Sequence, residues 1–214
     1  MAGSRIWDFY APFYDLFKRR NRSADAAIYR RICTVIRDRD VLEIAAGTGE
    51  LARSTAVYAR HMVAVDISEG MLARARAKGG PKNLVFRYGD AMDLPFGDAA
   101  FDVVIIANAL DIVPDARQVM REIRRVLKPQ GILIAPNCLH TDAGDSNLLR
   151  LAALSGMRFA RRWDETGYRQ FLQSCGFQEI GHQVLKGALP LMYIECRRQE
   201  DRKETGIGDE RKQP

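Results

Sequence analysis

Residues 40–52 have the sequence Asp-Val-Leu-Glu-Ile-Ala-Ala-Gly-Thr-Gly-Glu-Leu-Ala. The first part is a brief apolar run, typical of a parallel strand that is covered on both faces, formed by Val41, Leu42 and Ile44. Gly47 and Gly49 follow where the chain must turn sharply and let its backbone approach a ligand. From Glu50 onward the apolar spacing becomes helical. The stretch therefore predicts a strand, a glycine turn and a helix whose first N–H groups face the bound ligand.

Two ligand classes fit such a turn. The pattern Gly47-x-Gly49-x-x-Ala52 satisfies the dinucleotide fingerprint, in which the third glycine can be alanine. Glu43 indicates a different ligand, because a carboxylate at the strand end would repel a pyrophosphate and attract an ammonium group. S-adenosylmethionine carries a cationic amino acid end and no phosphate, and is the second class.

Residues 43–49 resemble the glycine motif of class I S-adenosylmethionine-dependent methyltransferases. The resemblance extends from about Tyr10 to Cys196 and is to small-molecule methyltransferases of the type 11 group, similar to the quinone-biosynthesis C-methyltransferases. It implies one α/β domain with a Rossmann-like, doubly wound, seven-stranded sheet, mostly parallel with an antiparallel last strand. The chain departs from the family at Ala45, where the family usually has glycine. The extra methyl group narrows the room for the methionine part of the cofactor and leaves the turn in place.

Acidic residues end the next two predicted strands. The strand at 62–65 ends in Asp66, about 20 residues beyond the glycines, where a nucleotide-binding fold places the acid that chelates ribose hydroxyls. The strand at 84–88 precedes Asp90, whose carboxylate can accept a hydrogen bond from the adenine amino group. The resemblance implies that the cofactor is S-adenosylmethionine and that the product formed from it is S-adenosylhomocysteine. The residues that it implies for the cofactor site are Tyr14, Glu43, Ala45, Gly47, Gly49, Asp66, Ile67, Met71, Asp90, Ala91 and Asn108.

The acceptor should bind near the ends of the fourth and fifth predicted strands, 103–107 and 132–135. Methyl transfer is an in-line displacement, so it depends mainly on positioning the nucleophile and excluding water. A general base is needed only if the acceptor arrives protonated. The residues expected to face the substrate are Tyr10, Asp111, Asn137 and His140. His140 and Asp111 are the candidates for a base, although a lone histidine is more often structural.

The N-terminal segment is rich in aromatic residues, and Ile6, Tyr10, Phe13 and Phe17 share one helical face. It is interpreted either as a lid over the cofactor or, with the basic residues 18–22, as a helix lying on a lipid surface. The resemblance implies that Tyr14 closes over the cofactor. The expected organisation is a lid and helix at 1–40, a methyltransferase core at 41–197 with a substrate-cap insertion at about 141–162, and a disordered charged tail at 198–214.

Several helices are expected around these strands. The first runs from an N-cap at Ser23 to about Ile36 and carries Ala26, Ala27, Tyr29, Ile32 and Cys33. Ser68 can cap the helix after Asp66, residues 127–131 stop the helix that starts at 114–115, and Tyr168 lies in a later helix.

Composition restricts the class of protein further. No apolar run approaches the roughly 18 residues that span a bilayer, and no signal peptide is recognised. The four cysteines form no C-x-x-C pair, which favours reduced thiols in the cytoplasm and no metal site. The net charge of +6 would suit nucleic acid or an anionic membrane, but a solvated basic helix face accounts for it.

Three other functions are compatible with parts of the sequence. A short-chain dehydrogenase would need a Tyr-x-x-x-Lys pair after the glycine turn, and the pair Tyr14 and Lys18 precedes it. A base-flipping methyltransferase would have prolines and an aromatic residue at 108–111. A protein that binds the cofactor without catalysis stays open, because fold does not fix function. We therefore expect a small-molecule substrate and no nucleic acid. The alternative is a phospholipid or membrane-quinone substrate, reached by peripheral membrane contact through the N-terminus.

Overall fold

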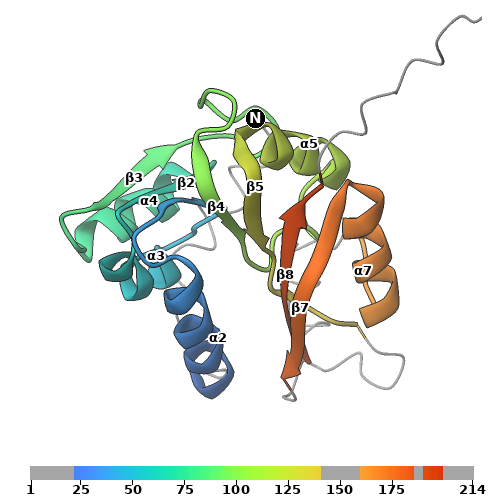
Figure 1. Cartoon of the computed structure of the whole chain (residues 1–214). Helices are drawn as coiled ribbons and strands as arrows, with labels where there is room; N and C mark the ends of the chain where they lie inside the picture. Colours follow the sequence, from blue (N-terminus) through green and yellow to red (C-terminus); the bar gives the residue numbers. More distant parts are fainter. Residues whose placement is uncertain (1–21, 141–159, 186–189, 200–214) are drawn as a thin grey trace, which may run out of the picture.

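The computed structural model describes residues 22–140, 160–185 and 190–199 of the 214-residue chain. Tyr10, Tyr14 and the rest of the expected lid before residue 22 lie outside the described residues. The same holds for most of the expected cap at 141–162 and of the expected tail at 198–214. The described part is a twisted sheet with helices packed on both faces (Figure 1).

The sheet has the expected Rossmann-like order. Its strands run, from one edge, β3 (Leu84–Tyr88), β2 (His61–Asp66), β1 (Asp40–Ile44), β4 (Phe101–Ile106), β5 (Leu127–Ile134) and β8 (Leu191–Arg198), with β7 (Phe177–Leu185) paired to β8. The first five strands are parallel, and β8 is antiparallel to both β5 and β7. The predicted mixed sheet with an antiparallel last strand is confirmed.

A short additional strand, β6 (Asn137–Cys138), brings the sheet to eight strands. It pairs with the start of β8, whereas β5 pairs with the end of β8. Because both are antiparallel to β8, β6 continues the course of β5 after a break at Ala135 and Pro136. The fifth strand thus reaches further toward its carboxyl end than the sequence predicted.

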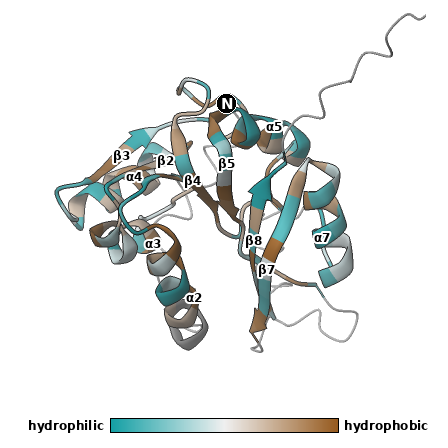
Figure 2. Cartoon of the chain, viewed as in Figure 1, coloured by the Kyte–Doolittle hydropathy of each residue, from teal (hydrophilic) through white to brown (hydrophobic). Residues whose placement is uncertain are grey.

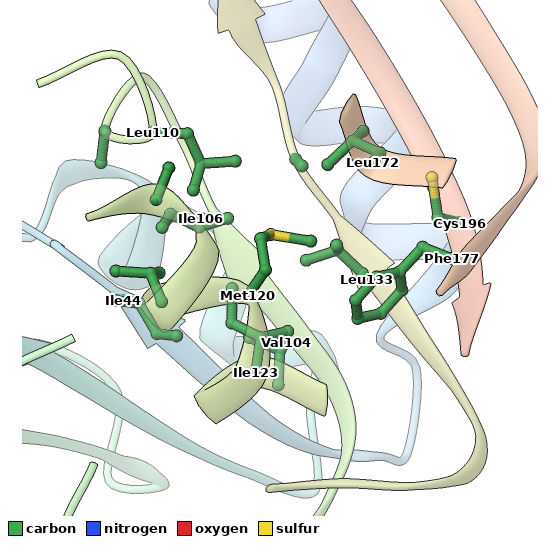
Figure 3. Packing of buried hydrophobic residues seen from close by; sticks show 14 of the residues in the cluster. Ile44, Val104, Ile106, Leu110, Met120, Ile123, Leu133, Leu172, Phe177 and Cys196 are labelled. Atoms are coloured by element: carbon green, nitrogen blue, oxygen red, sulfur yellow. The ribbon is translucent and has the colours of Figure 1, made fainter. Parts of the chain in front are cut away.

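The helices divide between the two faces because successive strand residues point to opposite sides. They are α2 (Arg22–Val35), α3 (Glu50–Thr55), the 3-10 turn η2 (Ala56–Tyr58), α4 (Glu69–Ala77), α5 (Ala116–Val126) and α7 (Glu165–Ser174). On one face Val104 and Ile106 of β4 pack with Met120 and Ile123 of α5 (Figure 3). On the other face the alternate residues of β4 pack against α2 and α3.

Hydropathy follows this layering. Hydrophobic residues gather in the strands at the middle of the sheet, whereas the helices α5 and α7 carry many hydrophilic residues (Figure 2). The central strand β4 is buried along nearly its whole length, with the pattern expected of a parallel strand covered on both sides. The core therefore fixes the positions of the strand ends, where the predicted site residues lie.

The first helix differs from the expectation in two details. Of the residues expected on it, Ile32 is buried, but Ile28 was left out, and the structure buries Ile28, Ile32 and Ile36. These residues are four apart and form one line along the helix and its end. The helix begins at Arg22, so Ser23 lies inside it and is not the N-cap.

The strand after α5 also starts earlier than predicted. The sequence placed a helix stop at 127–131, but Leu127 already pairs with Phe101 of β4. The register then shifts, and Gln130 has a left-handed φ of 61°. The turn signal at 127–131 thus marks an irregularity inside β5.

Candidate cofactor and acceptor site

The glycine turn after β1 uses three left-handed backbone positions. Ala45, Gly47 and Gly49 have φ values of 55°, 57° and 72°. At Gly49 the φ is left-handed and a Cβ atom would stand 2.6 Å from two ring atoms of Phe86, so both the backbone and the neighbouring ring favour glycine. At Ala45 the methyl group is present, and the left-handed conformation costs about 1–2 kcal/mol relative to glycine. The departure from the family pattern therefore places backbone strain in the turn.

Asp66, at the end of β2, is bonded to the glycine turn. It is 7% exposed; one carboxylate oxygen, Oδ2, accepts a hydrogen bond of 2.7 Å from the Gly47 N–H, and the other, Oδ1, accepts one of 2.8 Å from the Ser68 N–H. The carboxylate therefore joins the ends of β1 and β2. Each carboxylate oxygen can accept a second bond, so this role is compatible with the predicted contact to ribose hydroxyls.

Glu43 is buried in β1, between Ala64 of β2 and Ile105 of β4. It is the last residue but one of its strand. A carboxylate that is 3% exposed has lost most of its hydration, which makes a cationic ligand favourable at this position.

Helix α4 begins directly after Asp66. Ser68 is its N-cap, as predicted, and its hydroxyl oxygen accepts a 3.1 Å hydrogen bond from the Met71 N–H. Ile67 is half-buried and Met71 is buried. These two predicted cofactor residues therefore lie at the end of β2 and in the first turn of α4, next to Asp66.

Asp90 follows β3 and forms a tight turn. Its Oδ1 atom accepts a hydrogen bond of 2.8 Å from the Met92 N–H, and its carbonyl oxygen accepts one of 3.1 Å from the Asp93 N–H. Asp90 and Ala91 are only half-buried. The turn role and the predicted adenine contact are compatible, because the second carboxylate oxygen is not needed for the turn.

On the acceptor side, Asn108 links the ends of two strands. Its φ is 51°, its N–H donates to the Pro136 carbonyl at 2.8 Å, and its Oδ1 accepts from the Cys138 N–H at 2.9 Å. Asn137 is 1% exposed and donates from Nδ2 to the Cys138 carbonyl. Asn108 thus holds β6 beside the end of β4, a structural role that the sequence did not predict.

Asp111 and His140 lie close together beyond these strand ends. The Nε2 atom of His140 is 3.9 Å from the Oδ2 atom of Asp111, and the two side chains are 10% and 5% exposed. Tyr168 of α7, fully buried, donates its hydroxyl to the Ala135 carbonyl at 3.0 Å. Burial raises the pKa of Tyr168 well above its ordinary value, and the charge of Asp111 adds to that effect. Tyr168 was predicted only as a residue of a helix face.

Thiol and metal chemistry find little support among the described residues. Burial raises the pKa of the Cys33 and Cys175 thiols, and it raises the pKa of Cys196 to about 12, which makes these thiols poor nucleophiles. The described residues contain no cluster of three metal-ligating side chains. Two surface hollows lie along α7, one toward β7 and one toward α5, and the second is lined in part by Arg161 and Trp163.

Comparison with known proteins agrees with this geometry. Residues 42–135 match the methyltransferase domain family. The demethylmenaquinone methyltransferase of Clavibacter sepedonicus is 40% identical over 188 residues, which cover 78% of this chain and 76% of that protein. The enzyme of the same name from Renibacterium salmoninarum is 27% identical over 88% of this chain and 89% of that protein. The match to the one from Thermotoga maritima, at 37% identity, covers 61% of this chain and only 58% of that protein.

Solved structures share the fold. A methyltransferase in complex with the Trm112 methyltransferase activator of Haloferax volcanii superposes with a TM-score of 0.75 at 19% identity, over 91% of this chain and 98% of that one. An S-adenosylmethionine-dependent methyltransferase of Thermotoga maritima gives a TM-score of 0.74 at 20% identity, over 91% of this chain and 99% of that one.

The strand order, the glycine turn and the acids at the strand ends define an S-adenosylmethionine-binding Rossmann-like domain. The chain belongs to the class I S-adenosylmethionine-dependent methyltransferases, in the methyltransferase domain family that includes the relatives named above. S-adenosylmethionine is accordingly its methyl donor, and the dinucleotide alternative for the glycine turn is set aside. Within the described residues, no helix is long and apolar enough to cross a membrane.

Proposed function

We propose that this methyltransferase transfers a methyl group from S-adenosylmethionine to a ring carbon of a quinol related to demethylmenaquinone. The observation that carries the proposal is the 40% identity, over 188 residues, to a protein named demethylmenaquinone methyltransferase. The buried side chains beyond β4 and β6 are compatible with an acceptor bound there, since methyl transfer requires a dry and well-positioned nucleophile.

The cofactor is proposed to bind at the ends of β1, β2 and β3. In this proposal Glu43 faces the amino group of the methionine part, because it is a buried carboxylate next to the glycine turn. Asp66 holds the ribose hydroxyls, and Asp90 with the Ala91 N–H holds the adenine ring. The remaining contacts are proposed for residues of the turn and of the neighbouring strand ends: Ala45, Gly47, Gly49, Ile67, Met71 and Asn108.

The proposal extends to segments outside the described residues. Residues 1–20 are proposed to cover the cofactor and substrate, with Tyr14 over the cofactor and Tyr10 toward the acceptor. Residues 141–162 are proposed as the substrate cap. A quinol acceptor resides in a membrane, so we propose a cytoplasmic enzyme that touches the membrane surface through its aromatic and basic N-terminus.

The test is an assay of the full chain with methyl-labelled S-adenosylmethionine and two acceptors in separate vesicles, demethylmenaquinol and phosphatidylethanolamine. Methylated quinol detected by mass spectrometry is the expected result. Label in phosphatidylethanolamine alone would assign the enzyme to phospholipids, and no label in the quinol would contradict the proposal. Calorimetry with S-adenosylmethionine, and with NAD as the control ligand, establishes separately whether the cofactor site is competent.

A further inference from the structure

A buried acid and a histidine meet beyond the carboxyl ends of β4 and β6. We propose that His140 accepts the proton that the acceptor loses during methyl transfer, and that Asp111 positions His140 and stabilises its charged form. The inference rests on the proposed function in one respect, because it requires an acceptor that arrives protonated. The two side chains come from different loops and are 3.9 Å apart between Nε2 and Oδ2.

The backbone holds the two loops together. The carbonyl of Asp111 accepts hydrogen bonds from the N–H groups of Ala160 at 2.8 Å and Arg161 at 3.1 Å. The N–H of His140 donates to the carbonyl of Trp163 at 2.8 Å. A single segment, 160–163, is therefore bonded to both partners, and they cannot separate without breaking these bonds. Such positioning before the substrate binds is what a catalytic group requires.

The electrostatics of Asp111 favour a cationic partner. Its Oδ1 atom is buried and makes no hydrogen bond with the described residues. A buried carboxylate that is not fully bonded is costly, and a neighbouring imidazolium would offset that cost.

Other groups near Asp111 are already engaged. The fully buried Tyr168 of α7 interacts with its charge and donates its own hydroxyl to Ala135. The Arg161 guanidinium donates to the Val113 carbonyl at 3.3 Å. Among the described residues, His140 is the side chain within ion-pair distance of Asp111.

The proposed step balances in atoms and charge. The acceptor carbon forms a bond to the methyl carbon, and the bond from that carbon to sulfur breaks with its electron pair going to sulfur. S-adenosylhomocysteine is the neutral leaving group. In the proposed step the acceptor's proton moves to Nδ1 of His140, a buried ring atom, while the Nε2–H faces the Asp111 carboxylate. A distance of 3.9 Å is long for a hydrogen bond, but catalytic hydrogen bonds often tighten only when substrate binds.

The experiment compares His140→Gln, Asp111→Asn and a matched control, His61→Gln, in the full chain. His61 lies at the start of β2, the opposite end of the sheet, and its side chain is 73% exposed. His140→Gln should lower kcat about 10²–10⁴-fold while KM and S-adenosylmethionine affinity change little. Asp111→Asn should cause a smaller loss of kcat, and His61→Gln should cause none.

Nitrogen-15 NMR of the histidine rings should place the His140 proton on Nε2 in the wild type, and this preference should weaken in Asp111→Asn.

The outcomes separate this inference from the proposed function. If the wild type methylates the quinol and folded His140→Gln keeps its kcat within about threefold, the inference is overturned and the proposed function stands. If the wild type methylates no quinol, the proposed function fails, and the NMR result decides about the pair. An Nε2–H form that depends on Asp111 supports the pair, and a proton on Nδ1 or no response to Asp111→Asn overturns it. If His140→Gln does not fold, the kcat and NMR results for Asp111→Asn decide instead.

Discussion

The two ends of the parallel sheet hold their acidic residues in different ways. At the amino end, Asp40 accepts two hydrogen bonds from Arg60, at 2.6 and 3.0 Å, and Asp102 accepts one of 2.8 Å from Lys128. The two acids are each 27% exposed. At the carboxyl end, Asp66 is 7% exposed and accepts from backbone N–H groups. The amino end thus pairs each acid with a partly exposed cation, whereas the carboxyl end holds a buried acid by backbone N–H groups.

This difference separates stability from binding. Ion pairs near solvent contribute little and need no ligand. A buried carboxylate held by backbone N–H groups has lost its water and is fixed in direction, which suits a cofactor site. Substitutions of the buried acids at the carboxyl end should therefore affect cofactor binding strongly, and those in the ion pairs at the amino end should affect stability slightly.

The largest effect is expected for Asp66→Ala. The variant loses the proposed bonds to the ribose hydroxyls and the bonds to Gly47 and Ser68, which hold the turn. Cofactor binding should weaken by on the order of 2–4 kcal/mol, measured by calorimetry with S-adenosylmethionine. Asp98→Ala is the matched control, because Asp98 is 80% exposed and pairs only with Arg125 among the described ion pairs. Unchanged affinity in a folded Asp66→Ala protein would remove Asp66 from the cofactor site.

Gly49→Ala should be nearly as severe, this time in stability. The added methyl would meet the Phe86 ring at 2.6 Å and the backbone φ of 72° is unfavourable for alanine. The free energy of unfolding should fall by about 2–4 kcal/mol in urea denaturation. Gly79→Ala is the control, because its φ is 67° but nothing lies within 4 Å of the added atom. Equal losses for the two variants would mean that the contact with Phe86 contributes nothing.

The sequence predicted the parts of this site that depend on local pattern. The strands that end at Asp66 and precede Asp90, and the cap at Ser68, follow from short apolar runs and helix-start chemistry. The bond from Asp66 to Gly47 joins two strands, so it depends on their pairing, which no local pattern encodes. The distance between Asp111 and His140 depends in the same way on how two loops meet.

The first helix shows a second limit. The residues expected on this helix included Ala27 and Cys33 and left out Ile28, because short helical windows allow several apolar stripes. The structure selects the stripe of Ile28, Ile32 and Ile36 because that stripe packs against the sheet face opposite α5. Tertiary packing, which is absent from the sequence pattern, decides between stripes of similar apolarity.

The ion pairs of Asp40 and Asp102, at the amino end of the sheet, should make the protein modestly less stable in acid. Hydrogen bonds from Arg60 lower the pKa of Asp40. Burial acts to raise the pKa of Asp102, but hydrogen bonds from Lys128 and the Asp40 N–H outweigh it and lower the pKa. Because both pKa values are lower in the folded state, the stabilisation is present above the unfolded pKa of about 4 and is lost as the pH falls through the folded values.

Lys128→Met tests this interpretation. Its side chain is 35% exposed, so solvent screening limits the loss to below about 1 kcal/mol at neutral pH. The slope of unfolding free energy against pH below about pH 4 should also become shallower. Urea denaturation between pH 3 and 7, compared with wild type, measures both. An unchanged slope would mean that Lys128 does not set the acid response of Asp102.

The smallest effect is expected within the glycine turn itself, for Ala45→Gly. The φ of 55° at Ala45 favours glycine by about 1–2 kcal/mol in the folded state, but glycine also adds conformational freedom to the unfolded chain, which offsets up to about 1 kcal/mol. The net result should be a gain of about 0–1 kcal/mol in urea denaturation. Ala46→Gly is the control, because Ala46 is buried and is not among the left-handed residues, so its change should destabilise. If both variants lose stability equally, the backbone at Ala45 is not strained. The only consequence of the Ala45 methyl group would then be that it leaves less space for the methionine part of the cofactor. A rise in S-adenosylmethionine affinity in Ala45→Gly, absent in Ala46→Gly, would locate that narrowing at the methionine end of the cofactor.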